Sequence, residues 1–384
     1  MAISETQSDF LNLTRWIAAG LVVLEHARSL LFVDYGQTES PGILDKGFYF
    51  ATGFGHEAVV IFFVTSGFLV GGTAWDLFQK EQFEWRRYMA DRASRLYAVL
   101  IVAVILGGVM DWIGGNYFNA FGFYTDQTPE PVAVVGESFL DRLSLRHAAV
   151  SLIMFQEVWL PSFGSNGPLW SLAHEWWYYI LFPLLLGVLK GPALPRLVCA
   201  GLGILLCWLL TPYILILFGV WLLGVLGWRL NARRWFSPFL ALPVFFASLL
   251  MMRLEVHLFP YSHQYLLGLG FAILLNSVAG GENRFWLQGW SRWLADFSYS
   301  LYLIHLPVIL FITAVLFAAG DRLTRYELNL TTCLLFLAVV MAAYLVSFVV
   351  SLFTEAKTRH IRDRLYKAIG VGSSNTGADV TSKT

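Results

Sequence analysis

Long apolar stretches separated by short polar segments dominate this chain of 384 residues. An α-helix that crosses a bilayer needs about 20 mostly apolar residues. Ten segments approach that length, so we predict an all-α polytopic membrane protein, a bundle of about ten transmembrane helices. The ten segments are 10–32, 56–78, 93–112, 171–190, 194–211, 212–229, 237–255, 263–279, 297–319 and 328–354.

The distribution of Lys and Arg predicts how this bundle is oriented. Basic residues accumulate in cytoplasmic loops. Of the 26 basic residues, Arg15 and Arg28 belong to the first span; with the N-terminus inside, eighteen of the others face inward and six outward. No basic region or cleavage site precedes the first apolar segment, so we read it as a retained span. Both termini are therefore expected to be cytoplasmic.

The spans define one domain, expected at 1–360 and followed by a cytoplasmic tail at 361–384. The end of the tail, from Gly370, is small and polar, and we expect it to be disordered. The longest segment between spans, 113–170, is expected to face outward. Structureless loops of that length are uncommon in compact domains, which favours a functional role for it.

The composition supports lipid as the main solvent and narrows the possible partners. Apolar residues make up 57% and charged residues 14%, whereas soluble domains average about 45–50% and about 25%. The net charge of zero argues against a nucleic-acid partner. The three cysteines lie in apolar runs without metal-like spacing, so neither a disulfide nor a metal site is expected.

Arg15 and His26 are the clearest ionisable pair within a span, and ionisable residues in spans are candidate functional residues. Eleven residues make about three turns, so the two share a helical face and lie roughly 16 Å apart. The pantetheine arm of coenzyme A has a similar length, so Arg15 could hold phosphate while a thioester meets His26. Alternatively, Arg15 snorkels to the surface and His26 joins two helices.

Glu175 begins the apolar part of the fourth span, GPLWSLAHEWWYYILFPLL. Its expected depth matches that of His26, so Glu175 could orient or charge-stabilise that histidine as a general base. The alternative is a carboxylate that caps the start of its helix. His174 projects from a different face and is the weaker neighbour.

The second span contains FFVTSGFLVGG. Gly67, Gly71 and Gly72 allow another helix, or a ligand, to approach its backbone closely. Ser66 could donate a hydrogen bond to a thioester carbonyl or simply to its own helix. Helix packing is the favoured single explanation of the motif.

Arg92 and Arg95 begin the third span, three residues apart on one face. Two arginines at a membrane surface make a good phosphate clamp. Alternatively, the two arginines only hold this end of the span on the cytoplasmic side of the membrane.

In the ninth span, Ser298, Tyr302 and His305 share a face. His305 is expected to pack helices or contact a substrate arm rather than act as a second base.

Five motifs in order give the sequence a resemblance to the acyltransferase-3 family, integral-membrane O-acyltransferases that modify bacterial surface sugars and similar acceptors. One departure is TEAKTRH at 354–360, where the family has a Glu-x-Pro-like element. The motifs are Arg15 with His26, FFVTSGFLV (62–70), RASR (92–95), LWSLAHEWWYYILFP (169–183) and SYSLYLIHLPV (298–308).

The resemblance implies a mechanism and a location. Acyl-CoA, most often acetyl-CoA, would be a co-substrate rather than a bound cofactor, with its phosphates on Arg15, Arg92 and Arg95. Ser66, Tyr302 and His305 would line the site of its arm. His26, supported by Glu175, would deprotonate a hydroxyl of a carbohydrate or glycolipid acceptor, or would carry the acyl group itself. The resemblance also implies a location in a bacterial inner membrane. A second copy of the chain is a candidate partner, in a homo-oligomer.

Five aromatic residues of the outer segment could stack on the acceptor sugar or anchor the protein at the interface. A secondary transporter or flippase is the rival class, but the chain shows no paired, symmetry-related broken helices. A catalytically silent family member that acts as a binding subunit is a third reading. The five aromatic residues are Tyr117, Phe118, Phe121, Phe123 and Tyr124.

Overall fold

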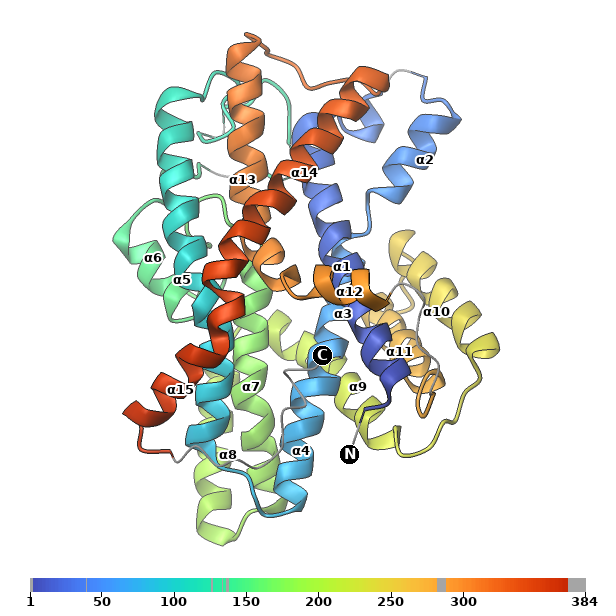
Figure 1. Ribbon diagram of the computed structural model, residues 1–384, viewed down its shortest axis with the longest axis vertical. Coiled ribbons are helices and arrows are strands. Elements are labelled where there is room, and N and C mark those ends of the chain that lie inside the picture. Colours follow the sequence, from blue (N-terminus) through green and yellow to red (C-terminus); the bar gives the residue numbers. More distant parts are fainter. Residues whose placement is uncertain are drawn as a thin grey trace.

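The computed structural model describes residues 3–38, 40–125, 127–132, 134–135, 138–281 and 288–371. Within these residues the regular structure is helical, and β-pairing is limited to isolated bridges. Most of the long helices run along one common axis (Figure 1). The predicted all-α fold is confirmed.

The helices follow one another with short connections, apart from the segment between α5 and α7. Their bounds are α1 Glu5–Leu31, α2 Ile43–Ala51, α3 Gly55–Ser66, α4 Gly72–Gln79, α5 Trp85–Tyr117, α6 Leu145–Leu152, α7 Leu169–Lys190, α8 Ala193–Leu209, α9 Pro212–Leu230, α10 Pro238–Arg253, α11 Ser262–Ser277, α12 Gln288–Ala295, α13 Ser298–Ala319, α14 Leu330–Phe353 and α15 Thr358–Ala368. A π-helical turn, η2 (Gly67–Gly71), joins α3 to α4, and short 3-10 turns lie at Tyr35–Gln37 and Glu355–Lys357.

Each of the ten predicted segments is helical, and the protein is a multi-pass membrane protein. Within the described residues, six helical stretches are long and apolar enough to cross a membrane. The helices α8 and α10 are apolar but shorter, and a 17-residue helix is only about 25 Å long, less than a bilayer core of about 30 Å. The six stretches are Ile43–Gln79, Trp85–Tyr117, Leu169–Lys190, Pro212–Leu230, Ser298–Ala319 and Leu330–Ala368.

Helix α1 lies at the centre of the bundle, packed against α3, α12, α13 and α14 (Figure 1). The side chain of Ser4 accepts a hydrogen bond from the backbone N–H of Gln7 and caps its start. Val23, Ala27 and Leu30 are fully buried along its length. Because other helices pack around α1, Asp9 is buried and Arg15 and His26 are partly buried among them.

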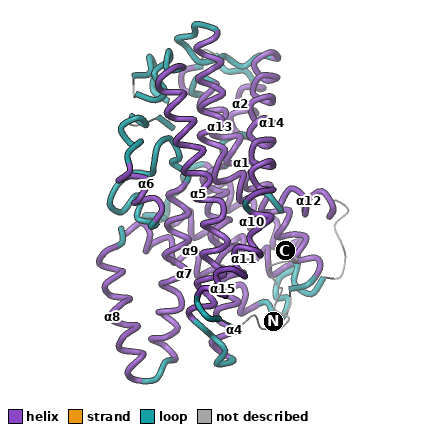
Figure 2. Tube along the Cα trace, turned by 60° about the vertical axis from the view of Figure 1, so that its left-hand side comes forward, coloured by secondary structure: helices purple, strands orange, loops and turns teal. Residues whose placement is uncertain are grey.

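Helix α8 is the opposite case, because none of its residues is buried. It stands at the edge of the bundle beside α7 (Figure 2). Leu194, Ile204 and Trp208 are among its most exposed side chains. In a membrane, this apolar surface faces lipid.

In the tail, α15 extends the chain as a helix to Ala368. Residues 372–384, where we predict disorder, lie outside the described residues.

The close approach predicted for the second span is confirmed at η2. A Cβ atom on Gly67 would collide with the backbone carbonyl of Trp221 on α9. A Cβ on Gly224 of α9 would in turn meet the carbonyl oxygen of Val64. Two backbones can touch in this way only where both helices carry glycine. The contact fixes the α3 face that carries Ser66.

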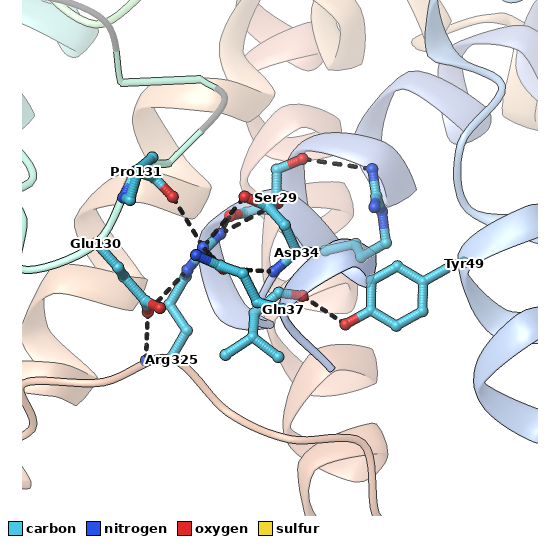
Figure 3. A network of polar contacts seen from close by, with 9 residues as sticks. Ser29, Asp34, Gln37, Tyr49, Glu130, Pro131 and Arg325 are labelled. Atoms are coloured by element: carbon cyan, nitrogen blue, oxygen red, sulfur yellow. Dashed lines mark hydrogen bonds and ion pairs between the residues drawn. The ribbon is translucent and has the colours of Figure 1, made fainter. Parts of the chain in front are cut away.

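Arg325 ties together the end of the bundle near the C-terminus of α1 (Figure 3). This residue is only 2% exposed. Its Nε and backbone N–H donate to Glu130 Oε1 at 3.0 and 2.9 Å, and its Nη2 pairs with Asp34 Oδ2 at 3.2 Å. Further bonds reach the carbonyl oxygens of Ser29 and Pro131. One guanidinium therefore joins α1, the segment after α5 and the connection between α13 and α14.

Candidate active site

The histidine of α1 contacts the histidine of α13 directly. Nδ1 of His26 lies 2.7 Å from Nε2 of His305, and the two rings are nearly parallel. Nδ1 of His305 lies 2.8 Å from the carbonyl oxygen of Tyr302, one turn earlier in its own helix. His305 is fully buried. The pair is thus an internal feature of the helix bundle.

These contacts determine where the ring hydrogens lie. A carbonyl oxygen can only accept, so His305 Nδ1 carries the hydrogen and donates to Tyr302. In the neutral imidazole, His305 Nε2 is then an acceptor, and His26 Nδ1–H donates to it. The remaining nitrogen of His26, Nε2, keeps its lone pair. An imidazole held in this way is suited to remove a proton from a substrate.

Six of the eight site residues proposed from the sequence line one cavity, here called the middle cavity. They come from α1, α3, α5, α7 and α13, which converge on it from widely separated parts of the chain. The other two, His26 and His305, form the pair described above. The six are Arg15, Ser66, Arg92, Arg95, Glu175 and Tyr302.

Glu175 takes part in a chain of hydrogen bonds along one wall of the middle cavity. The hydroxyl of Tyr179 donates to the Glu175 carboxylate. That hydroxyl lies 3.3 Å from Ser66 Oγ, which accepts from the indole of Trp221 at 3.2 Å. The Ser66 proton is therefore directed to Tyr179. The contact to His26 that was expected of Glu175 is supplied in the structure by His305.

The three arginines of the middle cavity also line a second cavity, here called the arginine cavity. Arg15 lies 3.9 Å from Glu355, whose other oxygen accepts two hydrogen bonds from Ser300. Nε of Arg92 is buried and has no hydrogen-bond partner among the described residues. An unpaired guanidinium donor beside further arginines suits a phosphorylated ligand.

Arg359 and Arg362 of α15 complete the arginine cavity, and the sequence analysis did not place them at a site. Their helix packs against α5, which carries Arg92 and Arg95. The hydroxyl of Tyr366 donates to Asp91 of α5 and helps to fix this contact. The signal in the sequence is the basic stretch TRHIRDRLYK, whose arginines also count toward the predicted cytoplasmic side.

A third cavity, here called the His26 pocket, adjoins the middle cavity. Val59 and Tyr302 line both of them. Oγ of Ser171 lies 2.6 Å from the Tyr302 hydroxyl, which holds that ring between the two spaces. The arginine cavity, the middle cavity and the His26 pocket are therefore neighbours in a row, and each adjoining pair shares lining residues. Arginines stand at one end and the His26 imidazole at the other.

A family model described as an acyltransferase domain, that of the acyltransferase-3 family, matches residues 8–352. The chain belongs to the acyltransferase-3 family. Acyltransferase MdmB of Streptomyces mycarofaciens is 26% identical over 231 residues, which are 59% of this chain and 51% of that protein. The chain thus spans about half the length of this relative. No solved structure matches it.

In this acyltransferase-3 protein, a proline on α13 anchors the segment that leads into α7. Pro307 has no N–H, so the carbonyl of Leu303, four residues earlier, lacks its helical partner. The Nδ2 of Asn166 donates to that carbonyl at 2.9 Å. The preceding Ser165 donates to both oxygens of the buried Asp111 at 2.7 Å. These bonds hold the start of α7 against the helix of His305.

The outer segment contributes differently from what the sequence suggested. Phe121, Phe123 and Tyr124 are almost completely buried, and both phenylalanines pack on Phe317 of α13. They cannot stack on a sugar, because their faces are already covered by protein. Tyr117 is exposed.

Within the described residues, no cluster of three or more His, Cys, Asp or Glu could hold a metal ion.

Proposed function

We propose that this protein is a membrane O-acyltransferase that moves an acyl group, most simply acetyl, from acyl-CoA to a hydroxyl of a carbohydrate or glycoconjugate. The observation that carries the proposal is the series of cavities. It runs from Arg15, Arg92 and Arg95 to the His26–His305 pair. A molecule that is anionic at one end and reactive at the other fits such a series.

The distribution of basic residues supports a placement of the two ends on opposite sides of the membrane. The arginine cavity contains α15 and the start of α5, the basic segments that the positive-inside rule places in the cytoplasm. Ten spans with both termini cytoplasmic agree with that orientation. Acyl-CoA then enters from the cytosol, and the acceptor reaches the His26 pocket from the other side. A bacterial inner membrane is the setting that the family implies.

His26 acts as the general base in this mechanism. Its Nε2 takes the proton of the acceptor hydroxyl while the hydroxyl oxygen attacks the thioester carbonyl carbon. The new C–O bond forms, the C–S bond breaks, and the departing thiolate of coenzyme A receives the proton back from His26. His305 holds the ring in the correct tautomer and stabilises the positive charge that develops on it. The acyl group thus passes directly to the acceptor.

The remaining residues of the middle cavity position the donor. The arginines bind the phosphates, and the arm lies along the wall formed by Ser66, Tyr179 and Glu175. Tyr302 stands at the junction with the His26 pocket, where the thioester must arrive. Glu175 acts through Tyr179 and Ser66 rather than on His26, because its hydrogen bond leads to them.

The proposal is tested with purified protein in detergent, acetyl-CoA and a methyl glucoside as the acceptor, with release of free coenzyme A as the measurement. We expect release that is lost in His26→Ala and kept in His147→Ala. The control histidine lies on α6, where its ring contacts Ser144 rather than any cavity residue. Undiminished release in His26→Ala, with binding of acetyl-CoA intact, would remove His26 from the role of base and overturn this mechanism.

A further inference from the structure

The His26 pocket contains chemistry that the acyl transfer step does not use. Apart from His26 and Tyr302, seven of its lining residues have polar or aromatic side chains, and they come from α1, α3, α7, the start of α9 and the segment before α7. None of its described lining residues is a Lys or an Arg. The seven are Glu25, His56, Glu157, Trp170, His174, Thr211 and Tyr213.

His174 offers an unused hydrogen-bond acceptor in this pocket. Its Nδ1 lies 2.8 Å from the carbonyl oxygen of Trp170, so Nδ1 carries the hydrogen and Nε2 keeps a lone pair. That Nε2 has no partner among the described residues, although the side chain is only 2% exposed. A buried acceptor without a partner costs free energy, and a ligand hydroxyl would satisfy it.

Two aromatic rings flank this acceptor. The centroid of the His174 ring lies 5.0 Å from that of Trp170 and 5.6 Å from that of Tyr213. The Trp170 and Tyr213 rings are 6.1 Å apart and tilted by 37°. Both are only partly buried, so each has surface available to a ligand. Aromatic faces beside polar groups suit a flat, amphipathic ring.

Two carboxylates set the charge of the pocket. One oxygen of Glu25 accepts from the backbone N–H of Gly55, and Oε1 of Glu157 accepts from Ser162. Among the described residues, no hydrogen bond reaches the second oxygen of either carboxylate. Arg28 interacts with Glu25 from one turn away on α1 but does not line the pocket. An anionic ring would be repelled here and a cationic one attracted.

We propose that the His26 pocket is an acceptor subsite for a hydroxylated ring without an acidic group, and that it prefers a ring bearing a protonated amine. This inference rests on the proposed acyltransferase function. One hydroxyl of the ring meets Nε2 of His26, and a second donates to Nε2 of His174. The ring lies beside Trp170 and Tyr213. Its amine faces Glu25 and Glu157, so the site discriminates by charge.

Three methyl glycosides with one ring but different charges test the inference: a glucosaminide, a glucoside and a glucuronide. Binding to the purified protein in detergent, with coenzyme A present, is measured by saturation-transfer NMR. We expect the aminated ring to bind best and the acidic ring worst. In Glu157→Gln the difference should shrink by about threefold, as for a partly exposed charge pair, and Glu25→Gln should add to the loss.

The control is Glu84→Gln, an exposed residue before α5 that lines none of the three cavities. It should leave the ranking unchanged, while His174→Phe should weaken all three glycosides. Equal binding of the three glycosides, or an unaltered ranking in the Glu25→Gln, Glu157→Gln double variant with a native unfolding midpoint, would overturn the inference. Release of coenzyme A that depends on His26 is measured separately, so the proposed function can survive that failure.

Discussion

Nδ1 of His26 and Nε2 of His305 lie 2.7 Å apart, although 279 residues separate them in the chain. The carbonyl of Tyr302 orients His305, and His305 in turn orients His26. In other enzymes with a histidine base, a buried carboxylate holds the imidazole in the correct tautomer and orientation. Here His305 has that role for His26. It explains how the imidazole is held inside a membrane protein without a charged partner in direct contact.

Loss of His305 should therefore reduce turnover while acetyl-CoA still binds. We expect His305→Ala to lower kcat by about 10²- to 10⁴-fold, because His26 loses its fixed tautomer, with little change in KM for acetyl-CoA. His305→Gln should recover part of the rate, since its amide oxygen can accept from His26. A His26→Ala, His305→Ala double variant should be no slower than His26→Ala alone. Fully additive losses would contradict the relay.

Arg92 and Arg95 should control the affinity for the donor. Replacing both with Ala is expected to raise KM for acetyl-CoA roughly tenfold or more, because charge-assisted bonds to phosphate are lost. The value of kcat should fall much less. Arg86→Ala, an exposed arginine on the same helix, is the matched control. An unchanged KM in the double variant would rule out a phosphate clamp.

Arg359 and Arg362 should matter only for the nucleotide part of the donor. We expect Arg359→Ala combined with Arg362→Ala to raise KM for acetyl-CoA several-fold. The same variant should leave the rate with S-acetyl-N-acetylcysteamine, which has the thioester but no phosphate, unaffected. Steady-state release of free thiol measures both. Equal loss with the two donors would mean that α15 acts on the fold rather than on the nucleotide.

Gly67 should be indispensable for packing. Gly67→Ala forces a methyl group against the Trp221 carbonyl and is expected to cost about 1–3 kcal/mol of stability, the range for overpacked sites. Gly201→Ala on α8 is the control, because nothing lies within 4 Å of its added Cβ. Thermal unfolding in detergent should show a lower midpoint for the first variant only. Equal midpoints would contradict the close helix contact.

Among the basic residues, Arg325 is expected to cause the largest loss of stability when it is replaced. Arg325→Ala leaves Glu130 and the partly exposed Asp34 without their partner, and leaving such groups unpaired costs about 1–3 kcal/mol. Arg322→Ala, three residues earlier, removes an exposed hydrogen bond to the Thr324 carbonyl and a contact with the Tyr326 ring, and should cost far less. The unfolding midpoints compare the two. A smaller effect at Arg325 would show that the network of Figure 3 forms weakly in solution.

The sequence by itself determined that this is a helical membrane protein, where its long apolar helices lie, and a set of candidate site residues of which six line the middle cavity. Runs of apolar residues suffice for the first two, because each helix satisfies its own backbone and needs only lipid around it. Arg15, His26 and Glu175 were identifiable for a related reason. An ionisable residue in an apolar span is costly and is kept only where it has a use.

Only the tertiary structure decided which of these residues touch. Glu175 and His26 could be placed at similar depth from their helices, but depth leaves open how each helix is rotated and which neighbour it meets. The packing of α1 against α13 gave His26 the partner His305, and the packing of α15 on α5 brought Arg359 beside Arg92. Such pairings arise from contacts between distant segments, and no local pattern of residues encodes them.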